Sequence, residues 1–249
     1  MQGLAGISFA MVLICAWVVA TRLLVLARRT RGLPEASLGA MLLSLIGLGY
    51  PLAILAQAES VLGLPACKAI QIASNSMIDL GMGLPLLFTW YVFRHDSRAA
   101  RSICLGAVFL LSVHLGASTV IALHLERMTD AITAVGRWAQ IPLSIGFLGF
   151  AWSGVESLRY RVLLARRAAL GLGDPIVANR MALWGALGLV TAAGALANSL
   201  FLMLEIDVVG DPLALALTSC TGIAQAALLY LAFLPPRSYL AWVTDRQTA

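Results

Sequence analysis

The chain has 249 residues, of which 60% are hydrophobic and 12% are charged, and it carries a formal net charge of +5. A soluble domain of this length has about twice this charged fraction, so the composition excludes an ordinary soluble protein. The apolar residues fall in runs of about 20, the length that a helix needs to cross a bilayer. Backbone groups in lipid must pair within their own segment, and strand-like alternation is missing, so these runs predict helices.

Seven runs are expected to cross the membrane. They cover residues 5–26, 37–57, 70–93, 103–123, 137–157, 178–204 and 212–234. Together they use most of the chain, so we expect residues 1–249 to form one all-α membrane domain, with residues 235–249 as a short interfacial tail. The first run is followed, not preceded, by basic residues, which reverses the charge order of a signal peptide. We therefore expect it to be retained as the first helix.

The basic residues predict the topology. Of the 17 lysines and arginines, 14 fall on one side of the seven segments. They are Arg22, Arg28, Arg29, Arg31, Arg94, Arg98, Arg101, Arg159, Arg161, Arg166, Arg167, Arg180, Arg237 and Arg246. This positive-inside pattern predicts an outside N-terminus and an inside C-terminus, and it argues against nucleic acid as the reason for the net charge. Arginine outnumbers lysine 16 to 1, a bias typical of GC-rich bacteria, so we expect a bacterial inner membrane.

The third segment contains an unusual polar stretch, "QIASNSMIDLGMGLP", at residues 71–85. Gln71, Asn75 and Asp79 are four residues apart and therefore share one helix face. A charged carboxylate in hydrocarbon is costly, so this face should point into the bundle or into a wet cavity. Two glycines and Pro85 follow, which favours a close helix approach and a bend. We predict a ligand site at Asp79; the alternative is an acid that only bonds a neighbouring helix.

Other segments supply polar partners for this face. His114 lies near the middle of the fourth segment and can share a proton with Asp79. Asn198 lies in the sixth segment, and Thr221 and Gln225 lie in the seventh. Such residues also serve as ordinary interhelical hydrogen bonds, and the sequence does not show which faces meet. The candidate ligand-binding residues are Asn75, Asp79, His114, Asn198, Thr221 and Gln225.

The connection between the fifth and sixth segments is "SLRYRVLLARRAALGLGDPIVANR", at residues 157–180. We expect the fifth helix to continue to about Leu170 and to end at a glycine. Asp174 and Pro175 are typical of an N-cap and a first helical residue. The Arg159–Arg180 hairpin would then project into the cytoplasm, either on lipid headgroups or as a docking surface for a protein partner. Glu156 is expected to pair with Arg159.

The tail begins after Pro235 and Pro236, which end the seventh helix. Tyr239, Leu240, Trp242 and Val243 predict a short amphipathic helix in the membrane interface. "RRAALGLGDPIVANRMALWG" and "LAFLPPRSYLAWV" resemble stretches of uncharacterised bacterial seven-helix membrane proteins. This resemblance covers about a sixth of the chain. It implies a seven-helix membrane architecture and does not identify a chemical activity.

Several kinds of chemistry are missing from the sequence. The 3 histidines fall at different depths and the 4 cysteines have no metal spacing, so we expect no metal, haem or other cofactor. No serine nucleophile elbow or phosphate-binding loop is present, so no catalytic residue is named. The topology resembles that of microbial rhodopsins, but the only lysine, Lys68, lies in a loop. A retinal Schiff base is therefore excluded.

These patterns favour a receptor-like sensor that binds a small or lipid-like ligand in a mid-membrane cavity and signals to a cytoplasmic partner. The alternatives are a small-solute or proton-coupled transporter with Asp79 as the titrating group, and a non-catalytic subunit of a membrane complex. An enzyme acting on lipids ranks last, because no nucleophile and base are visible.

Overall fold

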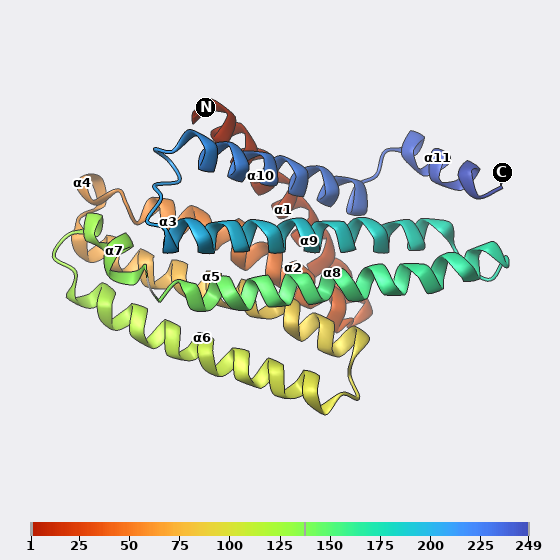
Figure 1. Ribbon diagram of the computed structural model, residues 1–249, viewed down its shortest axis with the longest axis horizontal. Coiled ribbons are helices and arrows are strands. Elements are labelled where there is room, and N and C mark those ends of the chain that lie inside the picture. Colours follow the sequence, from red (N-terminus) through yellow and green to blue (C-terminus); the bar gives the residue numbers. More distant parts are fainter. Residues whose placement is uncertain (1, 137, 249) are drawn as a thin grey trace.

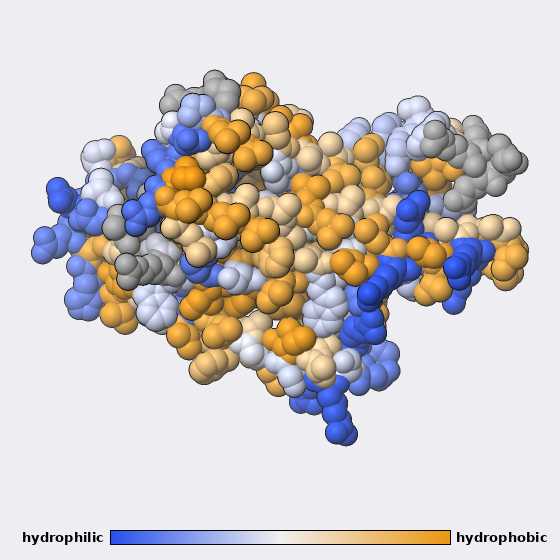
Figure 2. Space-filling model, in the orientation of Figure 1, coloured by the Kyte–Doolittle hydropathy of each residue, from blue (hydrophilic) through white to orange (hydrophobic). Residues whose placement is uncertain are grey.

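A computed structural model describes residues 2–136 and 138–248, and this part of the chain is helical throughout its regular structure, without a strand. Seven of the described helices are long and apolar enough to cross a membrane. The protein is therefore an all-α integral membrane protein, as the sequence predicts. Apolar residues cover the middle of the visible face, and polar residues gather at its two ends (Figure 2).

The spanning helices run close to the predicted ranges, and most extend beyond them. They are α1 (Gln2–Thr30), a second span made of α2 (Leu33–Leu42), η1 (Leu43–Gly49) and α3 (Tyr50–Leu55), then α5 (Leu64–Phe93), α6 (Arg98–His124), α8 (Gln140–Ala169), α9 (Pro175–Met203) and α10 (Pro212–Phe233). Short helices α4 (Glu59–Leu62), η2 (Met128–Asp130), α7 (Ala131–Val135) and α11 (Arg237–Thr248) complete the described structure.

The second span contains a π-helical stretch, η1, in which the Tyr50 N–H bonds the carbonyl of Leu45. Pro51 follows directly; it has no N–H, and its ring would clash with a carbonyl of a regular α-helix, so the wider turn accommodates it. The stretch packs closely on α5. A Cβ at Gly81 of α5 would lie 2.5 Å from the Cβ of Leu45, so glycine is required at this crossing.

The helix α5 lies at the centre of the packing. It contacts α6 on one side, α8 on another, and α2, η1 and α3 on a third. In contrast, α6 lies along one edge of the bundle, against α5 and, less extensively, α8 (Figure 1). The remaining helices follow the chain: α8 packs on α9, α9 on α10, and α10 on α1. The α5–α6 pair is therefore open on its outer side.

The two ends of the bundle differ in composition. One end, which we call the N-terminal end, carries the N-terminus, α4 and α7 (Figure 1). There the Glu59 carboxylate accepts the Met128 N–H at 2.8 Å, and the Lys68 ammonium donates to the Leu123 carbonyl at 2.9 Å. The other end, which we call the arginine-rich end, carries the α5–α6 loop, the α8–α9 hairpin and α11.

The α8–α9 hairpin is built as the sequence predicts. The helix α8 ends at Ala169, and Gly171 adopts a left-handed φ of 71°. Asp174 is the N-cap of α9: its carboxylate accepts the Ile176 N–H at 2.8 Å, and Pro175 is the first helical residue. The two helices extend together past the rest of the bundle (Figure 1).

The predicted tail helix is present as α11, after Pro235 and Pro236. It is attached to α9 by the amide of Asn179, which donates to the Tyr239 hydroxyl at 2.9 Å. The rings of Tyr239 and Trp242 lie 5.7 Å apart. The tail therefore lies against the first turns of α9, beyond the end of α10 (Figure 1).

Candidate functional site

The helices α5 and α6 bring Asp79 and His114 together. They are joined by a short loop and run in opposite directions, so residues near the middle of each lie at the same depth. The His114 Nδ1 lies 2.8 Å from Asp79 Oδ2 and 2.9 Å from Oδ1. Asp79 is 4% exposed and His114 is 3% exposed. Both residues are therefore almost completely buried in a segment where a single charge would be costly.

The geometry limits how protons are distributed over this pair. An imidazole nitrogen and a carboxylate oxygen at hydrogen-bond distance need one proton between them. An apolar surrounding favours a pair without net charge, and a neutral pair holds two protons in total. The second proton then belongs on Nε2 of His114, which has no hydrogen-bond partner among the described residues. The pair therefore presents a hydrogen-bond donor at Nε2.

A groove of about 330 Å³ runs between α5 and α6, and Asp79 is part of its lining. Most of its other lining residues are apolar. They are Leu80, Gly83, Leu84, Leu86 and Leu87 of α5, and Cys104, Ala107, Val108, Leu111 and Leu115 of α6, with Ser76 and Ser112 as the remaining polar members. Leu80 is 49% exposed and Val108 is 60% exposed. The groove therefore opens on the outer surface of the bundle, where lipid chains lie in a membrane.

Asn75 lies one turn from Asp79, toward the N-terminal end. Its Oδ1 accepts from the Gln71 amide at 2.9 Å, whereas its Nδ2 is buried without a partner among the described residues. The face predicted from the four-residue spacing is thus a continuous polar row. It runs from partly buried Gln71 to buried Asp79.

The other three candidate residues lie elsewhere. Asn198 on α9 donates to the Gly194 carbonyl, and Thr221 on α10 donates to the Leu217 carbonyl, both within their own helix. Gln225 on α10 donates to the Thr191 hydroxyl at 3.1 Å and so links α10 to α9. None of the three is part of the groove lining. These three residues make local or interhelical bonds, and of the six candidates only Asp79 is part of the groove lining. A ligand-binding role for Asn198, Thr221 and Gln225 stays a prediction.

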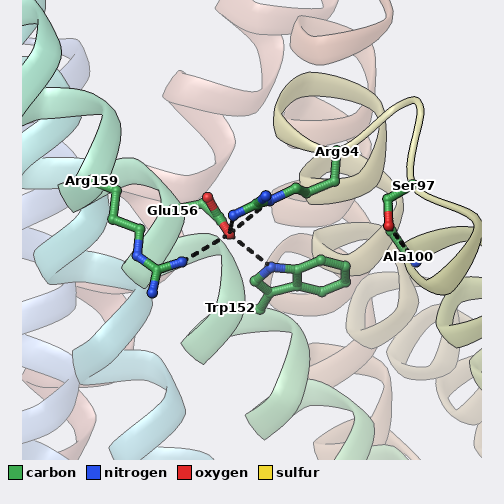
Figure 3. A network of polar contacts seen from close by, with 6 residues as sticks. All are labelled: Arg94, Ser97, Ala100, Trp152, Glu156 and Arg159. Atoms are coloured by element: carbon green, nitrogen blue, oxygen red, sulfur yellow. Dashed lines mark hydrogen bonds and ion pairs between the residues drawn. The ribbon is translucent and has the colours of Figure 1, made fainter.

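A second polar cluster lies at the arginine-rich end, and sequence reasoning found only part of it (Figure 3). Buried Glu156 on α8 accepts from Arg94 Nη2 at 2.8 Å and from Nε at 3.0 Å. The Trp152 indole donates to the same oxygen at 3.3 Å. Arg159, the predicted partner, lies farther away at 3.5 Å. Arg94 follows the third predicted span and Glu156 lies at the end of the fifth, so the sequence places both residues at the same end of the bundle. It does not show that the two side chains are in contact.

No group of three or more histidine, cysteine or acidic residues in the described part of the chain is arranged to hold a metal ion. No family model, no curated protein and no solved structure matches this chain.

Proposed function

We propose that this protein is a receptor-like membrane sensor that binds a lipid-like amphiphile in the α5–α6 groove. The observation that carries the proposal is the position of Asp79, which lies in the lining of an apolar groove and is paired with His114. The leucine-rich walls suit an alkyl chain. The Asp79–His114 pair offers the ligand's polar group a hydrogen-bond acceptor at mid-membrane depth.

The route of entry follows from where the groove opens. A ligand that partitions into the bilayer reaches the groove from the side, without crossing the polar ends of the bundle. The ligand's polar group must bond with Asp79 to compensate for its own desolvation. Binding therefore competes with, or reorients, the Asp79–His114 contact that joins α5 to α6. This gives the ligand different affinities for two packings of these helices, which is the requirement for a signal.

The arginine-rich end supplies an output for such a signal. Arg94 follows α5 directly, and its ion pair with Glu156 joins the α5–α6 loop to α8. The helix α8 continues into the projecting hairpin, whose arginines include Arg159, Arg166 and Arg167. A shift of α5 against α6 is thereby conveyed to the hairpin. We propose that a cytoplasmic protein with an acidic surface docks on the Arg159–Arg180 hairpin and reads its position.

The distribution of arginines supports a C-terminus in the cytoplasm of a bacterial inner membrane. Alkaline phosphatase activity reports a fusion point outside the cytoplasm, and green fluorescent protein fluorescence reports one inside it. A C-terminal fusion should be fluorescent, and a fusion in the loop after α6 should give phosphatase activity. The reverse result would invert the topology and remove the cytoplasmic output.

The ligand site is tested with dodecanol as a probe. Purified protein in lipid nanodiscs is melted with and without dodecanol, and tryptophan fluorescence reports unfolding. Binding to the native state raises the melting temperature. Ser112→Trp, which fills the groove from its open side, should abolish the increase, whereas Thr221→Val, at a half-buried polar position outside the groove, should preserve it. An equal increase in all three proteins would place the dodecanol outside the groove.

A proton-coupled carrier is the second candidate, because buried acid–histidine pairs are typical of proton relays in membranes. The two functions differ in a measurable way. A carrier would acidify the lumen of proteoliposomes when its substrate gradient is imposed, and Asp79→Asn would abolish this flux. Dodecanol binding without proton flux favours the sensor.

A further inference from the structure

Three buried side-chain atoms in the described part of the chain have no hydrogen-bond partner, and two of them flank Asp79. They are Nδ2 of Asn75 and Nε2 of His114; the third is Nε1 of Trp90. Asn75 is 7% exposed and His114 is 3% exposed. Buried polar groups in native proteins almost always have a partner, and an ordered water supplies it where the protein does not.

Both unpartnered atoms beside Asp79 are donors. The Asn75 oxygen already accepts from Gln71, which fixes the orientation of the amide and leaves its NH₂ group unpaired. His114 shares the proton on Nδ1 with Asp79, so a pair without net charge carries its second proton on Nε2. Two buried donors need an acceptor that also tolerates an apolar surrounding. A water molecule meets both requirements.

Along α5 the surroundings of the pair are polar in one direction only. Toward the N-terminal end lie Asn75, Gln71 and, on α6, fully buried Ser118. Toward the arginine-rich end, residues 80–88 of α5 are all apolar. In that direction α5, α6 and α8 pack together in a cluster of buried apolar residues. Its members are Leu86, Cys104, Ala107, Leu111 and Ile145.

We propose that Asn75 and His114 hold buried water, and that this water and Gln71 connect the Asp79–His114 pair to the aqueous phase at the N-terminal end. Water and ligand then reach the pair from different sides: water along the polar row of α5, and an amphiphile from the lipid side of the groove. The pair exchanges protons with one side of the membrane, so occupancy of the groove and protonation become coupled at the same two residues.

Other ionisable groups near the pair do not replace this route. Among the described elements packed on α5, α6 contributes His114 and Cys104 along this stretch, and α3 contributes Tyr50. Glu156 of α8 and Glu35 of α2 lie toward the arginine-rich end, beyond the apolar cluster. Ionisable side chains at the N-terminal end, such as Glu59 of α4, belong to the surface from which the water enters.

The test is water-edited solid-state NMR of protein labelled with ¹⁵N-histidine in lipid nanodiscs, without any added amphiphile. It measures how fast magnetisation passes from water to the Nε2–H of His114, whose signal is assigned by its loss in His114→Gln. The exposed ring of His95 provides a reference within the same sample. We expect clear transfer to His114 in the wild type, and a protected Nε2 without transfer would overturn the proposal.

Two variants at similar depth identify the route. Asn75→Leu removes one of the two donors and should slow the transfer about fivefold, the factor that one hydrogen bond of ordinary net strength contributes. Ser112→Leu fills the groove side and should leave the rate unchanged. Slowing by Ser112→Leu with none by Asn75→Leu would show that water enters from the groove. If Asn75→Leu does not fold, Gln71→Leu interrupts the same route nearer the surface.

These outcomes are independent of the sensor proposal. Water transfer without dodecanol binding would retain the hydrated pair and reject the ligand site. Dodecanol binding without water transfer would retain the ligand site and reject the hydrated pair.

Discussion

The carboxylate of Asp79 and the imidazole of His114 join α5 to α6 near the middle of both helices, with Nδ1 2.8 Å from Oδ2. Apart from this contact, the two helices meet mainly through apolar residues, with Leu86, Cys104, Ala107 and Leu111 among them. The pair is thus the main polar connection between α6, an edge helix, and the rest of the protein. Its loss should loosen α6 more than any other helix.

A double-mutant cycle measures this connection. His114→Leu should lower the free energy of unfolding by about 3–5 kcal/mol, because it leaves a buried carboxylate without its partner. Asp79→Leu should cost less, since a neutral imidazole remains. The double variant Asp79→Leu, His114→Leu should recover most of the loss, because both polar groups are gone. Unfolding in mixed micelles with increasing SDS gives the four free energies, and strictly additive losses would show that the two side chains do not interact.

The crossing of α5 and η1 gives a steric prediction. Gly81→Ala places a methyl group 2.5 Å from the Cβ of Leu45, so the π-helical stretch must move, at a cost of about 1–3 kcal/mol. Gly116→Ala is the matched control, because nothing lies within 4 Å of a Cβ at that position. The measurement is the melting temperature of each variant in nanodiscs. Equal melting temperatures for the two variants would contradict the close crossing.

The cluster around Glu156 predicts that two arginines near one carboxylate differ in importance. Arg94→Ala removes two hydrogen bonds of 2.8 and 3.0 Å from a buried oxygen and should cost about 1–3 kcal/mol. Arg159→Ala removes a 3.5 Å contact of a mostly exposed side chain and should cost less than about 1 kcal/mol. The measurement is the free energy of unfolding of each variant, compared with that of the wild type. A larger effect for Arg159 would make the Glu156–Arg159 pair predicted from sequence the stronger of the two.

The sequence predicts those features that depend on local chemistry. The length of the apolar runs defines the seven spans, and Asp174 with Pro175 defines the start of α9. The contact of Asp79 with His114 could also be predicted, because consecutive helices joined by a short loop are neighbours and these two residues lie at the same depth.

Features that depend on helix rotation were not predictable. In a membrane, a face toward lipid is as apolar as a face toward protein, so hydrophobic periodicity does not show which side of α9 or α10 meets α5. Asn198 and Thr221 were for this reason grouped with Asp79, although they bond within their own helices. The contact of Arg94 with Glu156 depends on the rotation of α8 in the same way. Pro51 indicates an irregularity in the second span, but the sequence does not show that the hydrogen bonds before it take the π-helical pattern of η1.

The attachment of the tail gives a final prediction. Tyr239 exchanges two hydrogen bonds with Asn179, at 2.9 and 3.3 Å, and these are polar contacts between α11 and α9. Tyr239→Phe removes both and keeps the ring, so it should weaken the docking of α11 by about 1 kcal/mol while global stability stays unchanged. Hydrogen exchange with mass spectrometry should show faster exchange in residues 237–244 alone. Faster exchange that extends through α9 would mean that the tail also stabilises the projecting hairpin.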